Sequence, residues 1–159
     1  MSSILRICAL LFLAASLLLG TQCRRLPPQS ESVCLGPGRD GTILVKAYGY
    51  GANNRAATKA ALKNAIQDAL FKGTPAGKPG CPSRPIVKDI SKRDSPYFKE
   101  FFKKNGAYLQ FINLTGDGNL ERTKVRRWVK VGVDAVIDHR RLRDQMVKDK
   151  QAASLNDGF

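Results

Sequence analysis

A strand followed by a long helix is the clearest prediction from the pattern of apolar and polar residues. Residues 42–50 (TILVKAYGY) are rich in β-branched and aromatic side chains, which is typical of a strand. Residues 55–72 then repeat small apolar side chains at helical spacing. Asn53 is suited to cap the start of this helix and Gly73 to end it. Because most of the apolar stripe is Ala, we expect the helix to lie unusually close to a sheet.

A short helix with an aromatic face is predicted next. It starts at Asp94 or Ser95 and has Pro96 in its first turn. Its aromatic side chains are Tyr97, Phe98, Phe101 and Phe102. Aromatic residues at this spacing are typical of a core, so we expect them to pack inside the domain rather than form a ligand site.

The last part of the chain predicts a β-hairpin and a final helix. Residues 107–114 (AYLQFINL) and about 124–137 form its two strands, joined through the turn-forming residues 115–119. Asp138 is suited to cap a helix over residues 139–151. Apart from Arg127 near its start, one parity of the second strand is apolar and is expected to face the core: Val125, Val129, Val131, Val133, Ala135 and Ile137.

Helices combined with an antiparallel hairpin indicate an α+β fold with two layers. We expect a small antiparallel sheet of about three strands, covered by the Ala-rich helix and joined by the short aromatic helix and the C-terminal helix. The domain should span residues 42–151. Residues 24–41 are rich in Pro, Ser and Gly and predict a tether, and residues 152–159 predict a frayed tail.

An apolar run near the N-terminus predicts export. Residues 7–20 (ICALLFLAASLLLG) have the length of a signal-peptide core, so residues 1–23 are expected to be a signal peptide. The run is shorter than the roughly 20 residues of a spanning helix, and a retained anchor is the alternative. Cys23 stands where a bacterial lipoprotein signal has its lipidated Cys, while plain cleavage around residues 20–23 fits equally. We expect an exported protein that is periplasmic or anchored to the outer membrane.

The cysteines predict one disulfide. Cys8 lies inside the signal, and Cys23 lies at its end. Cys34 and Cys81 remain, and an even pair in an oxidising compartment predicts a bond between them. Two free thiols are the alternative. The chain has a single His, so a zinc site built on these cysteines is not expected.

One local pattern resembles a known family. A strand that ends in an aromatic-Gly stretch runs into a helix that starts at Ala56-Ala57 and continues to Asp68-Ala69-Leu70. This pattern resembles the N-terminal domain of flagellar assembly protein T and related small bacterial surface lipoproteins, over residues 42–72. The resemblance implies an α+β domain that helps assemble or stabilise an envelope structure without catalysis. It transfers no functional residue to this chain.

Positive charge is the strongest functional signal. The chain has 27 Lys and Arg against 13 Asp and Glu, a formal net charge of +14 that is spread along its length. Nucleic acid is a common partner of basic domains, but export argues against it. Outside the cytoplasm the anionic partners are phospholipid headgroups, lipopolysaccharide, teichoic acids and cell-wall carboxylates. A purely colloidal role of the charge is the alternative.

Two sets of residues are candidates for contact with an anion. Arg55, Lys59 and Lys63 are spaced i, i+4, i+8 along the long helix with no acid among them. Arg126, Trp128 and Lys130 share the parity opposite the valines and combine charge with a stacking surface. The alternatives are an ordinary solvated helix face for the first set and, for Trp128, cover by the short aromatic helix.

Nothing in the sequence predicts catalysis. His139 stands alone at a helix start, and we expect it to be a surface residue rather than an acid–base group. We therefore expect no catalytic residue, metal or cofactor. The expected function is assembly or stabilisation of a cell-envelope structure through contacts with envelope proteins. The alternative is binding of an anionic envelope polymer or of lipid headgroups through a basic surface.

Overall fold

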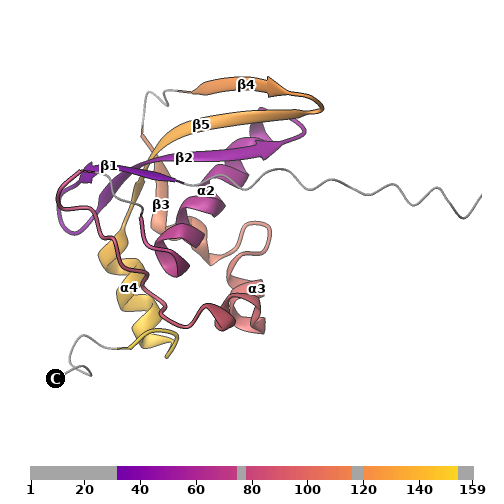
Figure 1. Ribbon diagram of the computed structural model, residues 1–159. Helices are drawn as coiled ribbons and strands as arrows, with labels where there is room; N and C mark the ends of the chain where they lie inside the picture. Colours follow the sequence, from indigo (N-terminus) through magenta and orange to yellow (C-terminus); the bar gives the residue numbers. More distant parts are fainter. Residues whose placement is uncertain (1–31, 75–77, 116–119, 154–159) are drawn as a thin grey trace, which may run out of the picture.

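An antiparallel sheet of five strands forms one layer of the molecule (Figure 1). In this computed structural model the described residues are 32–74, 78–115 and 120–153. The strand order is β1-β2-β5-β3, and β4 also pairs with β5. The prediction of an α+β domain is confirmed, although the sheet has more strands than the three expected. The strands are β1 (Val33–Pro37), β2 (Ile43–Gly51), β3 (Ile112–Leu114), β4 (Glu121–Val125) and β5 (Trp128–Ile137).

The helices form the second layer, on one side of the sheet (Figure 1). Three of those in the described residues are α-helices: α2 (Asn54–Phe71), α3 (Pro96–Phe101) and α4 (His139–Lys148). Two short 3₁₀ helices, η1 (Ile90–Asp94) and η2 (Ala107–Phe111), flank α3 in sequence. The helix starts follow the predicted caps, because the side chains of Asn53, Ser95 and Asp138 accept a backbone N–H at α2, α3 and α4.

The long helix lies very close to the sheet, as its Ala stripe predicted. Ala57, Ala61 and Ala65 of α2 are fully buried. They face Gly49 and Gly51 of β2, where an added Cβ would come within 2.2 Å of the Ala61 nitrogen and 2.3 Å of the Ala57 nitrogen. Small residues on both sides therefore let two backbones approach each other. The core continues through four residues of the predicted apolar parity, Val131, Val133, Ala135 and Ile137 of β5, while Val129 is only partly buried. The prediction is wrong for Val125, which lies on β4 and pairs with Trp128 across the hairpin.

The prediction of a tether over residues 24–41 is wrong for its second half. Residues 33–37 form the edge strand β1, which pairs antiparallel with β2. Ser32, fully buried, donates its backbone N–H over 2.9 Å and also its hydroxyl to Asp68 of α2. Pro and Gly suit an edge strand, because one of its sides needs no hydrogen bonds to a neighbour. The predicted signal peptide, Cys23 and residues 24–31 of the predicted tether lie outside the described residues.

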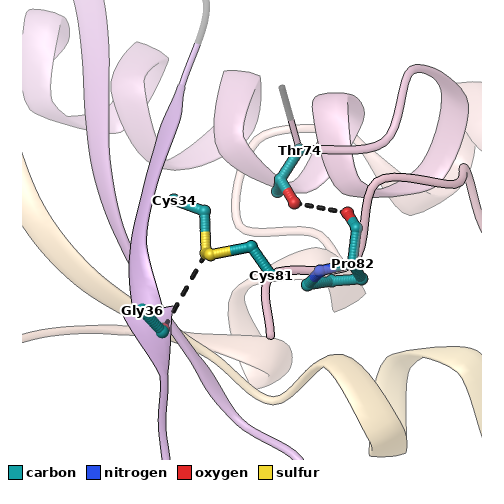
Figure 2. The surroundings of a disulfide bond; sticks show 5 residues. All are labelled: Cys34, Gly36, Thr74, Cys81 and Pro82. Atoms are coloured by element: carbon teal, nitrogen blue, oxygen red, sulfur yellow. Dashed lines mark hydrogen bonds between the residues drawn. A yellow bond between two sulfur atoms is a disulfide. The ribbon is translucent and has the colours of Figure 1, made fainter. Parts of the chain in front are cut away.

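The predicted disulfide is present between Cys34 and Cys81 (Figure 2). It joins β1 to the segment that follows α2, 47 residues away in sequence. Thr74 and Pro82 are joined on either side of Cys81: the Thr74 hydroxyl donates to the carbonyl of Pro82 (Figure 2), and the Thr74 backbone N–H donates to the same oxygen. Ile86 and Val87 then donate their N–H groups to carbonyls at the end of α2. The sheet edge and the end of α2 are thus held together.

Two strand predictions are wrong in the second half of the chain. Residues 107–111 form the helix η2 instead of a strand, because Tyr108 and Phe111 lie three residues apart and both enter the core. Only residues 112–114 form a strand. The predicted strand from 124 to 137 is broken by a two-residue turn at Arg126-Arg127, which creates the β4–β5 hairpin. In addition, α4 ends at Lys148 rather than at Gln151.

Candidate functional site

Six basic side chains line a double groove between α2 and the region of α3. The larger part, of about 600 Å³, is bordered by Lys63, Arg93, Lys99 and Lys103. The smaller part, of about 220 Å³, adds Lys59 and Lys104 and shares Lys63 and Lys103 with the first. We call these two adjoining hollows the basic groove. Asp94 is the one acidic residue among the described residues that line it.

The floor of the basic groove is aromatic. Phe98 and Phe102 of the α3 region line it and are buried. Phe98 meets Phe71 of α2 edge to face, with 4.8 Å between ring centroids. The ammonium of Lys63 lies 5.7 Å above the centre of the Phe102 ring. The aromatic face predicted for α3 is therefore core, and that core fixes the position of the lysines above it.

Within residues 32–74, 78–115 and 120–153, few charges of the basic groove have an acidic partner. Lys103 forms an ion pair with Glu100 of α3. Burial raises the pKa of the Tyr108 hydroxyl, so this groove residue is neutral at physiological pH. A hollow lined by charges of one sign concentrates the field of those charges and attracts counter-ions. Chemically, the groove is suited to hold an anionic group rather than to transfer a proton.

The structure divides the predicted row on α2. Lys59 and Lys63 line the basic groove, while Arg55 is exposed one turn earlier, near the start of the helix, and is not among the lining residues. Sequence analysis missed Arg93, Lys99, Lys103 and Lys104. They lie some 30 to 45 residues further along the chain, and only the packing of α3 against α2 brings them to the row.

The second predicted set lies at the start of β5. Arg126 occupies the first position of the β4–β5 turn, with φ of 54°. Trp128 is half-buried, and the guanidinium of Arg127 lies 5.5 Å from the centre of its ring. Lys130 places its ammonium 4.8 Å from the ring centre of Tyr48. The structure therefore brings two of the three predicted residues to one face of the sheet, Trp128 and Lys130, and places Arg126 in the turn beside them.

Trp128 is not covered by the short aromatic helix. It alternates with the buried parity of β5 and so faces away from the helix layer. The rings of α3 pack against Phe71 of α2, on the other side of the sheet. The same open face carries Tyr48, Tyr50 and an ion pair between Lys46 and Glu121. The hydrogen bond from Lys46 to Glu121 raises the pKa of the Lys46 ammonium.

Two other features bear on chemistry. His139 is half-buried at the start of α4, where burial and the nearby Arg143 lower its pKa. A separate hollow of about 640 Å³ lies between the α3 region and α4. At its edge Tyr97 donates a hydrogen bond to Asp149, whose carboxylate also accepts from Gln145, and these bonds lower the pKa of Asp149. In the described part of the chain, no three potential metal ligands come together.

Comparisons with family models, with curated proteins and with solved structures find no match to this chain. The resemblance to flagellar assembly protein T therefore stays a prediction. In residues 32–74, 78–115 and 120–153, no helix is both long and apolar enough to cross a membrane.

Proposed function

We propose that this protein is a non-catalytic binding protein of the cell envelope that holds an anionic polymer in the basic groove. The observation that carries the proposal is the convergence of six cations from three segments of the chain on one double hollow with a single acidic lining residue. Like charges repel one another, so this arrangement costs stability unless an anion relieves it. A colloidal role would be served as well by charges spread over the surface.

The continuity of the two hollows supports a polymer as the ligand. Its two parts are contiguous, since both are lined by Lys63, Phe102 and Lys103. A chain with regularly spaced phosphates or carboxylates can contact lysines from Lys99 to Lys59 in succession. Lysine ammonium groups act as mobile point charges, which suits repeated anionic groups better than one planar group of fixed geometry. Export, which the N-terminal sequence predicts, would bring the protein to such polymers.

The test compares two double variants on opposite walls of the groove. Lys59→Gln with Lys63→Gln removes charge from α2, and Lys99→Gln with Lys104→Gln removes it from the α3 side. Arg84→Gln with Lys88→Gln is the matched control, because both residues are exposed and line neither hollow. The probes are polyglycerol phosphate, a teichoic-acid chain, and polygalacturonate, a carboxylate chain.

Each groove variant should bind at least one probe about tenfold more weakly than the control, with a shallower dependence on salt. Stability should not fall, because repulsion between like charges is removed. If both groove variants bind like the control, the groove is only a charged surface and the proposal fails. Assembly of an envelope structure through protein contacts, the other expectation from sequence, stays a prediction.

A further inference from the structure

We infer that the β4–β5 hairpin docks the protein on the surface of an anionic lipid bilayer. This site is separate from the basic groove and does not depend on the polymer proposed for it. Residues 122–130 contain five Lys or Arg and no acid. Arg122, Lys124, Arg126 and Arg127 are all exposed. Each basic residue close to an anionic bilayer strengthens attraction about fivefold, so charge complementarity points to such a surface.

The position of the hairpin allows contact with a flat surface. The pairing of β2 with β5 ends at Gly51 and Val129, so Trp128 and the Arg126-Arg127 turn extend past the last paired residue of β2. Figure 1 shows this turn at one end of the sheet, away from α4. A planar bilayer contacts protruding parts of a protein and does not enter recessed ones. The hairpin is therefore suited to a bilayer, and the basic groove is not.

The aromatic residues beside the turn fit the polar boundary of a bilayer. Trp128 is half-buried on the open face of the sheet, next to Val125, its partner across the hairpin. Tyr48 and Tyr50 follow on the same face, with the Lys130 ammonium 4.8 and 6.0 Å from their ring centres. Trp and Tyr side chains prefer the headgroup region, because one end of each ring is apolar and the other forms hydrogen bonds.

The backbone of the turn gives an independent argument. Arg126 has φ of 54°, in the left-handed region that favours Gly, Asn or Asp in two-residue hairpins. An Arg at this position is strained, and Gly would serve the fold better. Strained residues persist where function needs them, and here the strained residue is an exposed Arg in the turn of the hairpin.

The test uses the fluorescence of Trp128, the only Trp of the chain. The purified protein is mixed with vesicles of phosphatidylglycerol and phosphatidylcholine, and with vesicles of phosphatidylcholine alone. We expect the emission of Trp128 to shift to shorter wavelength only with the anionic vesicles, and lipids brominated on their acyl chains to quench it. Because the signal comes from the hairpin, attachment of the chain elsewhere does not produce it.

The variant Arg126→Gln with Arg127→Gln should partition about 30-fold more weakly, whereas Arg84→Gln with Lys88→Gln should bind like the wild type. The groove variant Lys59→Gln with Lys63→Gln should keep the vesicle response, which separates this inference from the proposed function. Three results would overturn it: no spectral shift with anionic vesicles, an equal shift with soluble polyglycerol phosphate, or an unchanged partition of the Arg126/Arg127 variant.

Discussion

The basic groove and the β4–β5 hairpin both concentrate positive charge, but the chain builds them in different ways. The groove takes Lys59 from α2 and Lys104 from the segment after α3, and these residues meet only because an aromatic core holds α3 against α2. The hairpin takes its cations from nine consecutive residues joined by one turn. The groove therefore depends on tertiary packing, and the hairpin depends on local pairing. Variants that weaken the core should affect the two regions unequally.

The largest effect is expected from loss of the disulfide. Replacing Cys34 and Cys81 with Ser frees a loop of 47 residues and should lower the free energy of unfolding by about 4 kcal/mol. Urea unfolding followed by Trp128 fluorescence reports the hairpin, and far-UV circular dichroism reports the helices. We expect coincident transitions, shifted together. Separate transitions would show that groove and hairpin belong to different cooperative units.

A substitution in the groove floor should separate the two regions. Phe102 is 7% exposed and lies beneath both hollows of the groove. Phe102→Ala should lower the free energy of unfolding by about 3 kcal/mol, because it leaves a cavity. Binding of polyglycerol phosphate should fall with it, while the vesicle response of Trp128 in the folded protein should not change. Equal losses in both assays would contradict the independence of the two sites.

A substitution in the turn should raise stability and reduce binding. Arg126→Gly removes the strain of an Arg in the left-handed region. Gly also adds conformational entropy to the unfolded chain, which offsets part of this gain. The free energy of unfolding should therefore rise by about 0.5–1 kcal/mol. With one charge fewer, partition to anionic vesicles should fall about fivefold. Chemical denaturation and vesicle titration measure the two changes. If the variant were more stable and still bound anionic vesicles like the wild type, the strain at Arg126 would have no role in membrane binding.

The smallest expected effect is a change of stability with pH, and binding at the basic groove and at the hairpin should not follow it. The folded-state pKa of His139 is lowered from 6.5 by burial and by Arg143, so the unfolded chain takes up a proton more readily than the folded one. The free energy of unfolding is therefore highest above pH 6.5, and it falls as the pH drops from 6.5 through the folded-state pKa of His139. His139 lines neither hollow of the basic groove and lies outside the β4–β5 hairpin, so its titration should leave binding at both sites constant.

His139→Gln provides the comparison for that experiment. The variant should lack this part of the pH dependence of unfolding, measured by urea titration at several pH values. If binding of polyglycerol phosphate or of vesicles followed the titration of His139, the two sites would not rest on Lys and Arg alone.

Local features of the sequence predicted much of the fold. Alternation and helical spacing located β2 and α2, and the side chains of Asn53 and Asp138 predicted helix starts that the structure confirms. The sequence does not predict a strand at residues 33–37, because β1 forms through its pairing with β2 and its Pro and Gly residues give no sign of that pairing. The turn at Arg126-Arg127 was missed, because neither residue is one that a left-handed turn prefers.

The candidate sites were predictable to different degrees, because the sequence shows local spacing but not tertiary packing. Trp128 and Lys130 are neighbours on one strand face, so their parity was visible in the sequence. In the groove, the spacing of Lys59 and Lys63 was visible, but Arg93 and Lys99 were not predictable from spacing. Their position depends on how the rings of α3 pack against Phe71, and no short-range pattern encodes that arrangement.

The way the chain enters the domain has a mechanical consequence. The first described residue, Ser32, is bonded to Asp68 of α2, and the disulfide follows two residues later at Cys34. A force applied through the preceding residues would break the contacts of Ser32 and then act on a covalent bond. Peeling of β1 from the sheet would stop there, and tension would pass into the segment that follows α2. The domain could thus be pulled from its N-terminal side without losing its edge strand.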